Sequence, residues 1–365
     1  MSPPLRPPDP NEVEVSLFGP GVGESLAIHT GDGRWVLVDS CRDRDGTNAT
    51  LRYLDRIGVD PAASVDWVIA THAHNDHVNG LAEIVRTCTS ARLVLPAAST
   101  AAEFLSLVGM DHGLVGYGVA TRVYSEFYDV MQIVLNRTPT REVYYASAGQ
   151  VLPPGASLPS SGASMRMTTL APSPRAELQS RRFFAAVMSS CRKVTEVRQI
   201  AKRDPNSYSL GLLLDIHGVQ VLLGGDVLNG VSPDTGWRYV CANFPPQHVD
   251  VHKVPHHGSA GAFAEDIWSD WLQVGSVSIL TAYWPSRLPN DASITRMASY
   301  GHKLYATSRT ISSAEPRKAQ RVAAALSGIS RSVRSARGVL GHVRVRLQPG
   351  NSAVVTLVPP ALELA

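Results

Sequence analysis

The chain has 365 residues, 44% of them hydrophobic, and a formal net charge of +3 at pH 7. This is the composition of an ordinary globular protein with a real core, and the charge is too small to indicate a nucleic-acid binder by itself. Because the proline-rich first ten residues lack an apolar signal segment and no stretch reaches about 18 uncharged apolar residues, we expect a cytoplasmic protein without a membrane span.

The first hundred residues alternate between predicted strands and helices. Apolar runs bounded by turn residues predict strands at 13–18, 25–30, 34–40, 65–72 and 91–96. Apolar positions three or four apart predict helices over 50–57 and from 78 to 85. Strands that alternate with helices favour an α/β architecture.

The middle of the chain is less regular. Residues 98–147 carry aromatic side chains without a clean period, so we expect partly helical structure whose aromatics either pack in the core or cover a partner interface. A loop is expected at 151–164 and a strand at 164–172. Apolar residues then step by three or four from Phe184 to Ala201, which predicts an amphipathic helix with a basic opposite face.

The last third returns to strands. Residues 209–216 and 219–225 predict a hairpin with an exposed turn at His217, and further strands are expected at 249–254, 276–284 and 303–307. A helix is predicted over 293–300, and the alternating tail at 343–359 suits an antiparallel edge hairpin. We expect one domain over 13–365 after a flexible lead at 1–12, with an insertion around 98–147 and a basic helix around 176–203.

Positive charge is concentrated in two segments of this nearly neutral chain. Such segments either attract an anionic substrate or form solvated helix faces, and the sequence leaves both interpretations open. The basic residues are Arg175, Arg181, Arg182, Arg192, Lys193, Arg198, Lys202 and Arg203 in the first segment, and Arg317, Lys318, Arg321, Arg331, Arg334, Arg337, Arg344 and Arg346 in the second.

The cysteines are widely spaced and form no CxxC pair. They indicate reduced, mostly buried thiols, and they suggest neither a disulfide framework nor a zinc ribbon. They are Cys41, Cys88, Cys191 and Cys241.

The stretch THAHNDHVNG at 71–80 concentrates metal-binding side chains. His72 and His74 are two residues apart, so they project to the same side of an extended segment that leaves a strand. Asp76 and His77 follow where the next helix begins. Imidazole and carboxylate ligands suit zinc, iron or manganese, and this loop can serve two cations.

Three other strand ends carry candidate residues. Asp226 in VLLGGDV is either a metal ligand or a helix cap. In KVPHHGS, His256 and His257 again place imidazoles at a strand end. Asp39, which ends RWVLVDSC, is either a turn residue or a carboxylate that orients a ligand imidazole.

HAHNDH resembles the HxHxDH signature of the metallo-β-lactamase superfamily, and Asp39, Asp226 and the histidine pair stand in that superfamily's order. The segments FGPGVGESLAIHTGDGRWVLVDS, NSYSLGLLLDIHGVQVLLGGD and VHKVPHHGS resemble the branch that includes the hydrolase domain of competence DNA-uptake channel proteins. The resemblance covers roughly residues 13–310 and is loose over 98–145.

The resemblance implies an αββα sandwich, two mixed sheets flanked by helices, with the site at the sheet edge. It implies two divalent ions, zinc or manganese with magnesium as a further option. His72 and His74 would bind the first ion, Asp76 and His77 the second, and Asp226 both. His256 or His257 would complete the second site, and Asp39 would support the ligands.

One position departs from many members of the superfamily. They place a third histidine for the first ion roughly twenty residues before the bridging aspartate, where this chain has DPNSYSL. Asn206 is the expected substitute. Because a neutral amide oxygen is a weaker and harder ligand than imidazole, manganese or magnesium gains plausibility beside zinc.

The resemblance implies a hydrolase in which a metal-activated hydroxide attacks its substrate, with Asp76 and His257 as candidate catalytic residues. A phosphodiester, such as DNA or RNA, is favoured by the branch resemblance and by the basic segments. A carboxylic ester, lactone, thioester or lactam is the second alternative. A non-catalytic metal-binding module of a larger complex is the third, and nothing in the sequence identifies a protein partner.

Overall fold

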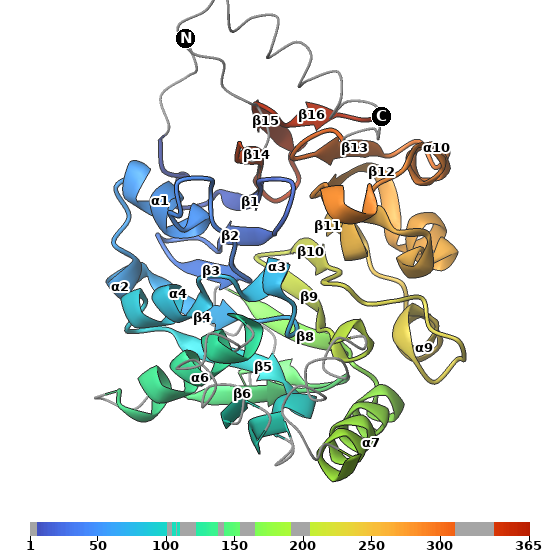
Figure 1. Cartoon of the computed structure of the whole chain (residues 1–365). Coiled ribbons are helices and arrows are strands. Elements are labelled where there is room, and N and C mark those ends of the chain that lie inside the picture. The colour runs from blue at the N-terminus through green and yellow to red at the C-terminus, as the bar shows by residue number, and fades with distance from the viewer. Residues whose placement is uncertain are drawn as a thin grey trace, which may run out of the picture.

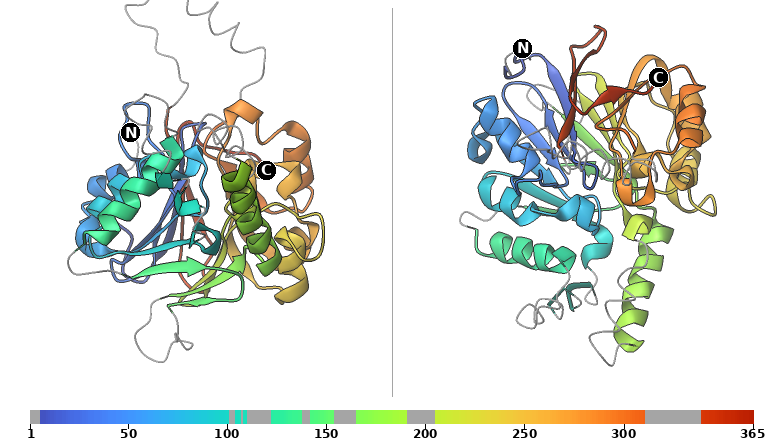
Figure 2. Two further views of the ribbon diagram at one scale, coloured as in Figure 1. Left: turned by 60° about the horizontal axis from the view of Figure 1, so that its bottom comes forward. Right: turned by 45° about the horizontal axis from the view of Figure 1, so that its top comes forward.

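The computed structural model describes residues 6–100, 104–106, 108–109, 122–137, 142–153, 165–190, 205–310 and 339–365. These residues build two eight-stranded sheets that pack face to face, with helices on their outer sides (Figure 1). Both views in Figure 2 show the strands between two sets of helices. The arrangement is the expected αββα sandwich.

The first sheet joins the N-terminal strands to the C-terminal hairpin. From β1 to β3 neighbouring strands are antiparallel, and from β3 to β6 they are parallel. The strand order is β15 (Val354–Val358), β14 (Gly341–Leu347), β1 (Val13–Gly19), β2 (Ser25–His29), β3 (Trp35–Val38), β4 (Val65–Ile69), β5 (Arg92–Pro96) and β6 (Val143–Ala146).

The second sheet repeats this design. Strands β7 to β10 are antiparallel, and β10 to β13 are parallel. The order is β16 (Leu362–Glu363), β13 (Lys303–Ala306), β12 (Leu272–Leu280), β11 (Val249–Lys253), β10 (Val219–Leu223), β9 (Gly211–Ile216), β8 (Arg166–Ala171) and β7 (Val151–Leu152). In each sheet, parallel strands therefore release their carboxyl ends at a common edge, where binding sites of α/β proteins form.

Helices cover the outer face of each sheet, and apolar clusters fill the three interfaces of the sandwich. The α-helices are α1 (Ala49–Arg56), α2 (Pro61–Ser64), α3 (Asn75–Val78), α4 (Leu81–Thr87), α6 (Arg122–Leu135), α7 (Pro174–Ser190), α9 (Gly236–Asn243) and α10 (Asp291–Ala298). Short helical turns are η1 (Ala97–Thr100), η3 (Pro205–Tyr208), η4 (Pro255–Gly258), η5 (Ala260–Ala262), η6 (Ile267–Trp271) and η7 (Trp284–Ser286).

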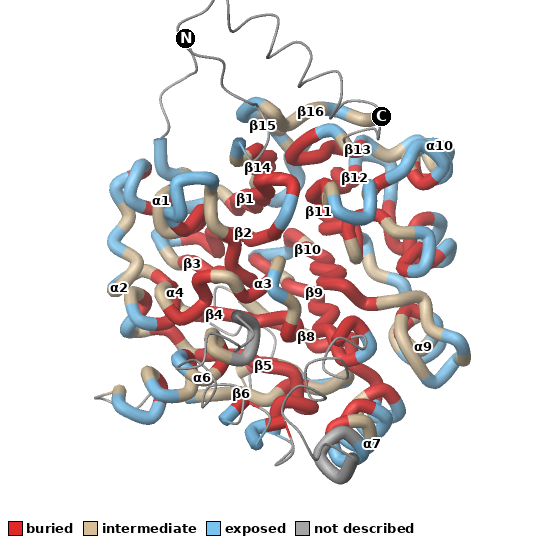
Figure 3. Tube along the Cα trace, viewed as in Figure 1, coloured by how far each residue is buried: buried red, intermediate tan, exposed pale blue. Residues whose placement is uncertain are grey.

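Strand β1 shows how the sequence fills two layers at once. Because successive side chains point to opposite faces, Val15 and Leu17 enter the core between the sheets, whereas Phe18 packs in the core beneath the helices. Central strands such as β1, β2 and β3 are buried throughout, whereas β15 and β16 at the sheet edges are not (Figure 3). Among the helices that the structure describes, none combines the length and apolarity needed to cross a membrane.

Residues 98–147, which show no clean period in the sequence, contribute a helix and a strand to the sandwich where the structure describes them. Part of the predicted insertion forms α6, and β6 extends the first sheet beside β5. Phe104 and Phe127 are buried in the helix-side core, as the core-packing interpretation expected, while Tyr117 lies outside the described residues.

One expectation about charge needs correction. Arg344 and Arg346 belong to β14 and are buried, and Arg346 binds the carboxylate of Glu14, so neither forms an exposed basic face. The predicted antiparallel edge hairpin is confirmed: β14 pairs with β15, which is the edge strand of the first sheet, and β14 joins the hairpin to β1. The other basic positions of the second segment, 317–337, lie outside the described residues.

The remaining predictions fall partly within the described chain. Helix α7 covers the start of the basic helix, and its continuation over 191–204, which includes Cys191, lies outside. Cys41 and Cys88 are buried free thiols and Cys241 is half-buried, as expected for reduced cysteines. His217 is exposed in the β9–β10 turn, as predicted.

Candidate metal centre

The candidate residues meet where strands of the two sheets end. Asp39 follows β3 and the histidine-rich loop follows β4 in the first sheet. Asp226 follows β10, and His256 and His257 follow β11 in the second. Both sheets deliver these loops to the same edge of the sandwich, because Asp226 contacts His77 and His257 contacts Asp76 across the two sheets.

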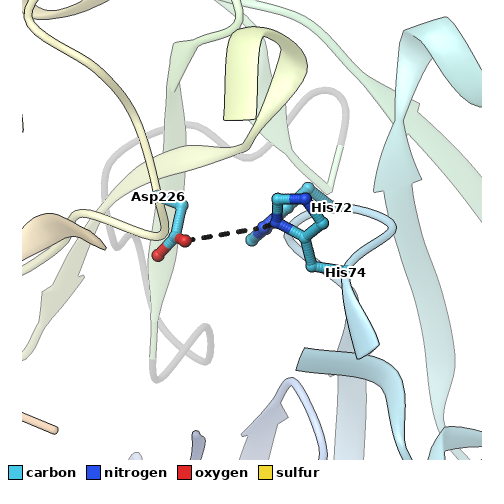
Figure 4. A group of neighbouring side chains, drawn as sticks. All are labelled: His72, His74 and Asp226. Carbon is cyan, nitrogen blue, oxygen red and sulfur yellow. Dashed lines mark hydrogen bonds and ion pairs between the residues drawn. The ribbon is translucent and has the colours of Figure 1, made fainter. Parts of the chain in front are cut away.

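The first group contains His72, His74 and Asp226. One ligand atom from each lies within 4.8 Å of the others. His72 Nε2 is 2.9 Å from His74 Nδ1 and 3.7 Å from Asp226 Oδ2. Figure 4 shows the two imidazoles and the carboxylate pointing toward one another. These three side chains could hold one cation.

The second group contains Asp76, His77 and His257, again within 4.8 Å. Asp76 Oδ2 is 3.3 Å from His257 Nε2 and 3.7 Å from His77 Nε2. His77 and His257 are almost fully buried, so the three side chains offer a preformed site for a second cation.

Asp226 faces both groups. Its Oδ2 atom lies 3.7 Å from His72 Nε2, and its Oδ1 atom lies 3.4 Å from His77 Nε2. A single carboxylate therefore presents one oxygen to each group, which is the arrangement that a bridging ligand requires.

Asp39 orients the loop of the first sheet. The Thr71 amide donates to Asp39 Oδ1, and the Thr71 hydroxyl and His77 Nδ1 donate to Asp39 Oδ2, all at 2.7 Å. Since His77 Nδ1 donates to Asp39, Nε2 is the nitrogen that faces Asp76 and Asp226. Asp39 thus contacts His77 directly and is linked to the rest of the loop through Thr71.

His72 is oriented through the same threonine. The Thr71 hydroxyl has one proton, which it donates to Asp39, so at 3.0 Å it accepts from His72 Nδ1. The Nε2 atom of His72 is then the unprotonated nitrogen that faces the first group. Thr71 was not singled out by the sequence, although its position next to His72 was the available signal.

His256 and His257 lie on different sides of the centre. His257 belongs to the second group, whereas His256 Nε2 lies 3.9 Å from Asp226 Oδ2 and accepts from Asn206 Nδ2 at 3.3 Å. The side chain of His256 is 26% exposed and that of His257 is 1% exposed. The sequence left open whether His256 or His257 completes the second site. Of the two, His257 has the geometry of a ligand, which narrows the choice.

Three buried atoms at the centre have no hydrogen-bond partner among the described residues: His77 Nε2, Asp226 Oδ1 and Asn206 Oδ1. Buried polar atoms are nearly always paired, so three orphaned atoms in one place require an explanation. Each belongs to a residue that the sequence analysis proposed as a metal ligand. The residues present therefore fit bound cations, including an amide oxygen in place of the missing imidazole.

The electrostatics of the centre agree with that fit. Burial lowers the pKa of His77, but Asp226, Asp39 and Asp76 outweigh it and raise the pKa well above its ordinary value. Burial raises the pKa of Asp226, yet His77, His257 and His72 hold it well below its usual range. In the metal-free chain a proton on His77 thus balances the carboxylates, and cation binding would release it.

Burial is the largest effect on His72 and His256. It lowers the pKa of His72 well below the ordinary value, with a smaller contribution from His77 in the same direction, and it lowers the pKa of His256 against the opposing effect of Asp226. Burial also raises the pKa of Asp39, against the opposing effect of His77. Neutral imidazoles are the form that binds metal ions, so His72 is prepared for this role.

Glycines allow the second-sheet loops to reach the centre. Gly225 has φ of +49°, and a Cβ there would lie 2.4 Å from the Leu210 carbonyl oxygen. A Cβ on Gly224 would lie 2.8 Å from the Lys253 carbonyl oxygen. The GG pair before Asp226 is therefore required by close backbone packing. His256 and His257 themselves adopt φ of +48° and +54°, a strained geometry typical of functional sites.

Comparison with known proteins supports the superfamily assignment for the first part of the chain. Residues 18–97 match the family model described as Metallo-beta-lactamase superfamily. This segment contains Asp39 and the whole histidine-rich loop. None of the curated proteins matches the chain.

Several solved structures show weak similarity. The metallo-beta-lactamase fold protein YhfI from Bacillus subtilis aligns at 12% identity and a TM-score of 0.33, over 66% of this chain and 70% of that one. A mutant of the CmlA beta-hydroxylase aligns at 16% identity and a TM-score of 0.35, over 70% of this chain and 38% of that one. The metal-soaked Flv1 flavodiiron core from Synechocystis sp. PCC6803 aligns at 11% identity and a TM-score of 0.27, over 56% of this chain and 34% of that one.

Proposed function

We propose that the chain belongs to the metallo-β-lactamase superfamily and is a metal-dependent hydrolase of phosphodiester bonds. The match of residues 18–97 to that family's model and the sandwich formed by the described sheets and helices support the proposal. The observation that carries the proposal is the placement of Asp226 between two buried groups of metal-binding side chains.

In the proposed centre, His72, His74 and Asn206 would hold one cation, Asp76, His77 and His257 would hold the other, and Asp226 would be available to both. The ions would be zinc or manganese, with magnesium as a further option. When bound, two such cations lower the pKa of a water molecule and stabilise the negative charge that develops during hydrolysis.

The side chains of the chain supply orientation and proton control. Asp39 and Thr71 fix the imidazoles of the first loop, and the second loop brings Asp226 and His257 against them. His256 is the partly exposed histidine beside Asp226, which suits contact with the substrate or proton donation to it. Asp76, which contacts both histidines of the second group, is placed to accept a proton from water.

Exposed basic residues on helix α7 favour an anionic substrate. Arg175, Arg181 and Arg182 are exposed on this helix. The Ser180 hydroxyl of α7 lies 3.4 Å from that of Ser207 in η3, the turn that carries Asn206. Helix α7 therefore lies beside the turn that carries Asn206, and its exposed arginines could bind backbone phosphates of a substrate held there.

The activity test uses purified chain loaded with zinc, manganese or magnesium. We expect cleavage of bis(p-nitrophenyl) phosphate and of labelled single- or double-stranded nucleic acid, and we expect that His74→Ala abolishes it. Cleavage that survives this substitution would rule out the proposed centre as its source. Loss of nucleic-acid cleavage alone in Arg182→Ala would support the role of α7.

A parallel assay separates the alternatives. Turnover of a lactone, thioester or nitrocefin-like lactam without cleavage of any phosphodiester would move the substrate to the carboxylic class. Near-stoichiometric metal without turnover of any ester would favour a non-catalytic metal-binding module.

A further inference from the structure

We propose that Glu24, Lys253 and Thr281 form a buried relay that positions His257 as a ligand of the second cation and anchors the loop of Asp226. The proposal rests on the metal centre proposed above, but it does not depend on the substrate. None of the three residues is a metal ligand in that centre, so they are positioning residues.

Glu24 and Lys253 form an ion pair inside the protein. Lys253 Nζ lies 2.5 Å from Glu24 Oε1, and both side chains are 1% exposed. Glu24 lies between β1 and β2 of the first sheet, whereas Lys253 ends β11 of the second. Because burying two charges is costly and seldom improves stability over apolar packing, a buried pair beside a candidate centre calls for a functional explanation.

The hydrogen bonds of the relay have only one consistent direction. Glu24, as the anionic partner of Lys253, offers only acceptors, so the Thr281 hydroxyl donates to Glu24 Oε2 at 2.6 Å. That hydroxyl has no second proton, and it therefore accepts from His257 Nδ1 at 2.8 Å. With Nδ1 donating to Thr281, Nε2 is the nitrogen of His257 that faces the second group, 3.3 Å from Asp76 Oδ2.

The same residues hold the neighbouring ligands. Lys253 Nζ also donates to the Gly225 carbonyl at 3.1 Å, one residue before Asp226. The Glu24 amide donates to the Asp76 carbonyl at 2.8 Å. Through these contacts, one ion pair between the sheets fixes His257, Asp76 and the backbone that precedes Asp226.

Glu24 itself does not form an independent cation site. Its carboxylate lies within 4.8 Å of ligand atoms of Asp39 and His77. Asp39 and His77, however, bind each other, while Glu24 is bound by Lys253 and Thr281. We therefore assign Glu24 to support of the second cation.

Thr281→Val tests the relay because it removes the hydroxyl and keeps the shape of the side chain. Zinc titration by calorimetry, with a competing chelator, should show two equivalents for the parent chain. In Thr281→Val the affinity for one equivalent should fall by about 10–100-fold, the usual effect of losing a group that orients a metal ligand. Thr281→Ser, which restores the hydroxyl, should recover most of this affinity.

Thr71→Val is the matched control, since Thr71 orients His72 of the other group. It should weaken a zinc equivalent while Thr281 and His257 remain intact, and the double variant should weaken both. Imidazole ¹⁵N chemical shifts of the zinc-loaded parent chain give a second readout. We expect the signals missing in His257→Gln to report a protonated Nδ1 and a metal-bound Nε2.

The outcomes separate the relay from the proposed function. Unchanged affinity for both equivalents in a folded Thr281→Val chain, or a serine variant as weak as the valine variant, overturns the relay alone. If Thr281→Val does not fold, a proton on Nε2 of His257 in the zinc-loaded parent chain overturns it. A parent chain that binds no zinc overturns the metal centre and the relay together, whereas full zinc binding without hydrolysis overturns only the proposed activity.

Discussion

In both loops of the candidate centre a threonine hydroxyl links a histidine to a buried carboxylate, but the linked residues come from different parts of the chain. In the first sheet, Thr71 links His72 to Asp39, which is 32 positions away. In the second, Thr281 links His257 to Glu24, which is 257 positions away and belongs to the other sheet. The hydrogen bonds of Thr71 form between loops of one sheet. Those of Thr281 form only when both sheets are packed together, so the affinity for the second cation should depend on the packing of the two sheets.

Substitution of Asp226 should lower the metal affinity of both groups, whichever loop supplies their histidines. Because its two oxygens face both groups, Asp226→Asn should reduce the affinity for both zinc equivalents by more than about 100-fold, beyond the loss expected for an orienting residue. Metal analysis after dialysis and calorimetric titration measure this effect. Asp234→Asn, an exposed carboxylate further along the same loop, is the control and should retain both ions.

Removal of Asp39 should have the next largest effect. Asp39 binds His77 of the second group directly and His72 of the first group through Thr71. Asp39→Asn should therefore weaken both equivalents by about 10–100-fold each, whereas Thr71→Val should weaken only one. Titration of the two variants side by side distinguishes the predictions. Equal effects of the two substitutions would show that Asp39 acts only through Thr71.

Asn206 should have a smaller effect that is confined to one cation. Its buried Oδ1 atom has no hydrogen-bond partner among the described residues, and the neighbouring His256 Nε2 lies 3.9 Å from Asp226 Oδ2. Asn206→Ala should lower one zinc affinity by about tenfold, and Asn206→His should shift the preference from manganese toward zinc. Competition between the two metals measures the shift. An unchanged preference in Asn206→His would remove Asn206 from the ligand set.

The smallest predicted effect compares a buried histidine in each sheet. Burial lowers the pKa of His342 on β14 and of His252 on β11 to about 3. Below about pH 6.5 the unfolded chain takes up a proton that the folded chain does not. The stabilisation from each neutral imidazole is therefore complete above that pH and is lost as the pH falls toward 3, by up to about 1.4 kcal/mol per pH unit.

Urea unfolding of the chelator-treated chain between pH 7 and pH 5 measures this slope. His342→Gln and His252→Gln should each make the free energy of unfolding less dependent on pH. His217→Gln, at an exposed turn, is the control and should keep the slope of the parent chain. Equal slopes in all variants would show that the buried histidines do not contribute to acid sensitivity.

The sequence was informative where chemistry and local structure coincide. The loop with His72, His74 and His77 is contiguous, so its spacing alone indicated a metal site. The strands were also predictable, because runs such as 13–18 and 249–254 are apolar and bounded by turns. The basic residues Arg344 and Arg346 were misleading, because charge in a sequence does not show that a strand partner such as Glu14 will bury it.

The sequence by itself determined which residues could bind metal ions, since ligand type and strand-end position are properties of short segments. Only the tertiary structure decided how these residues are divided between the two groups. It placed Asp226 between two groups, put His257 rather than His256 beside Asp76, and brought Glu24 to Lys253 and Thr281. Hydrogen-bond direction depends on which donor meets which acceptor, and here the partners come from different sheets, so no local pattern could contain that information.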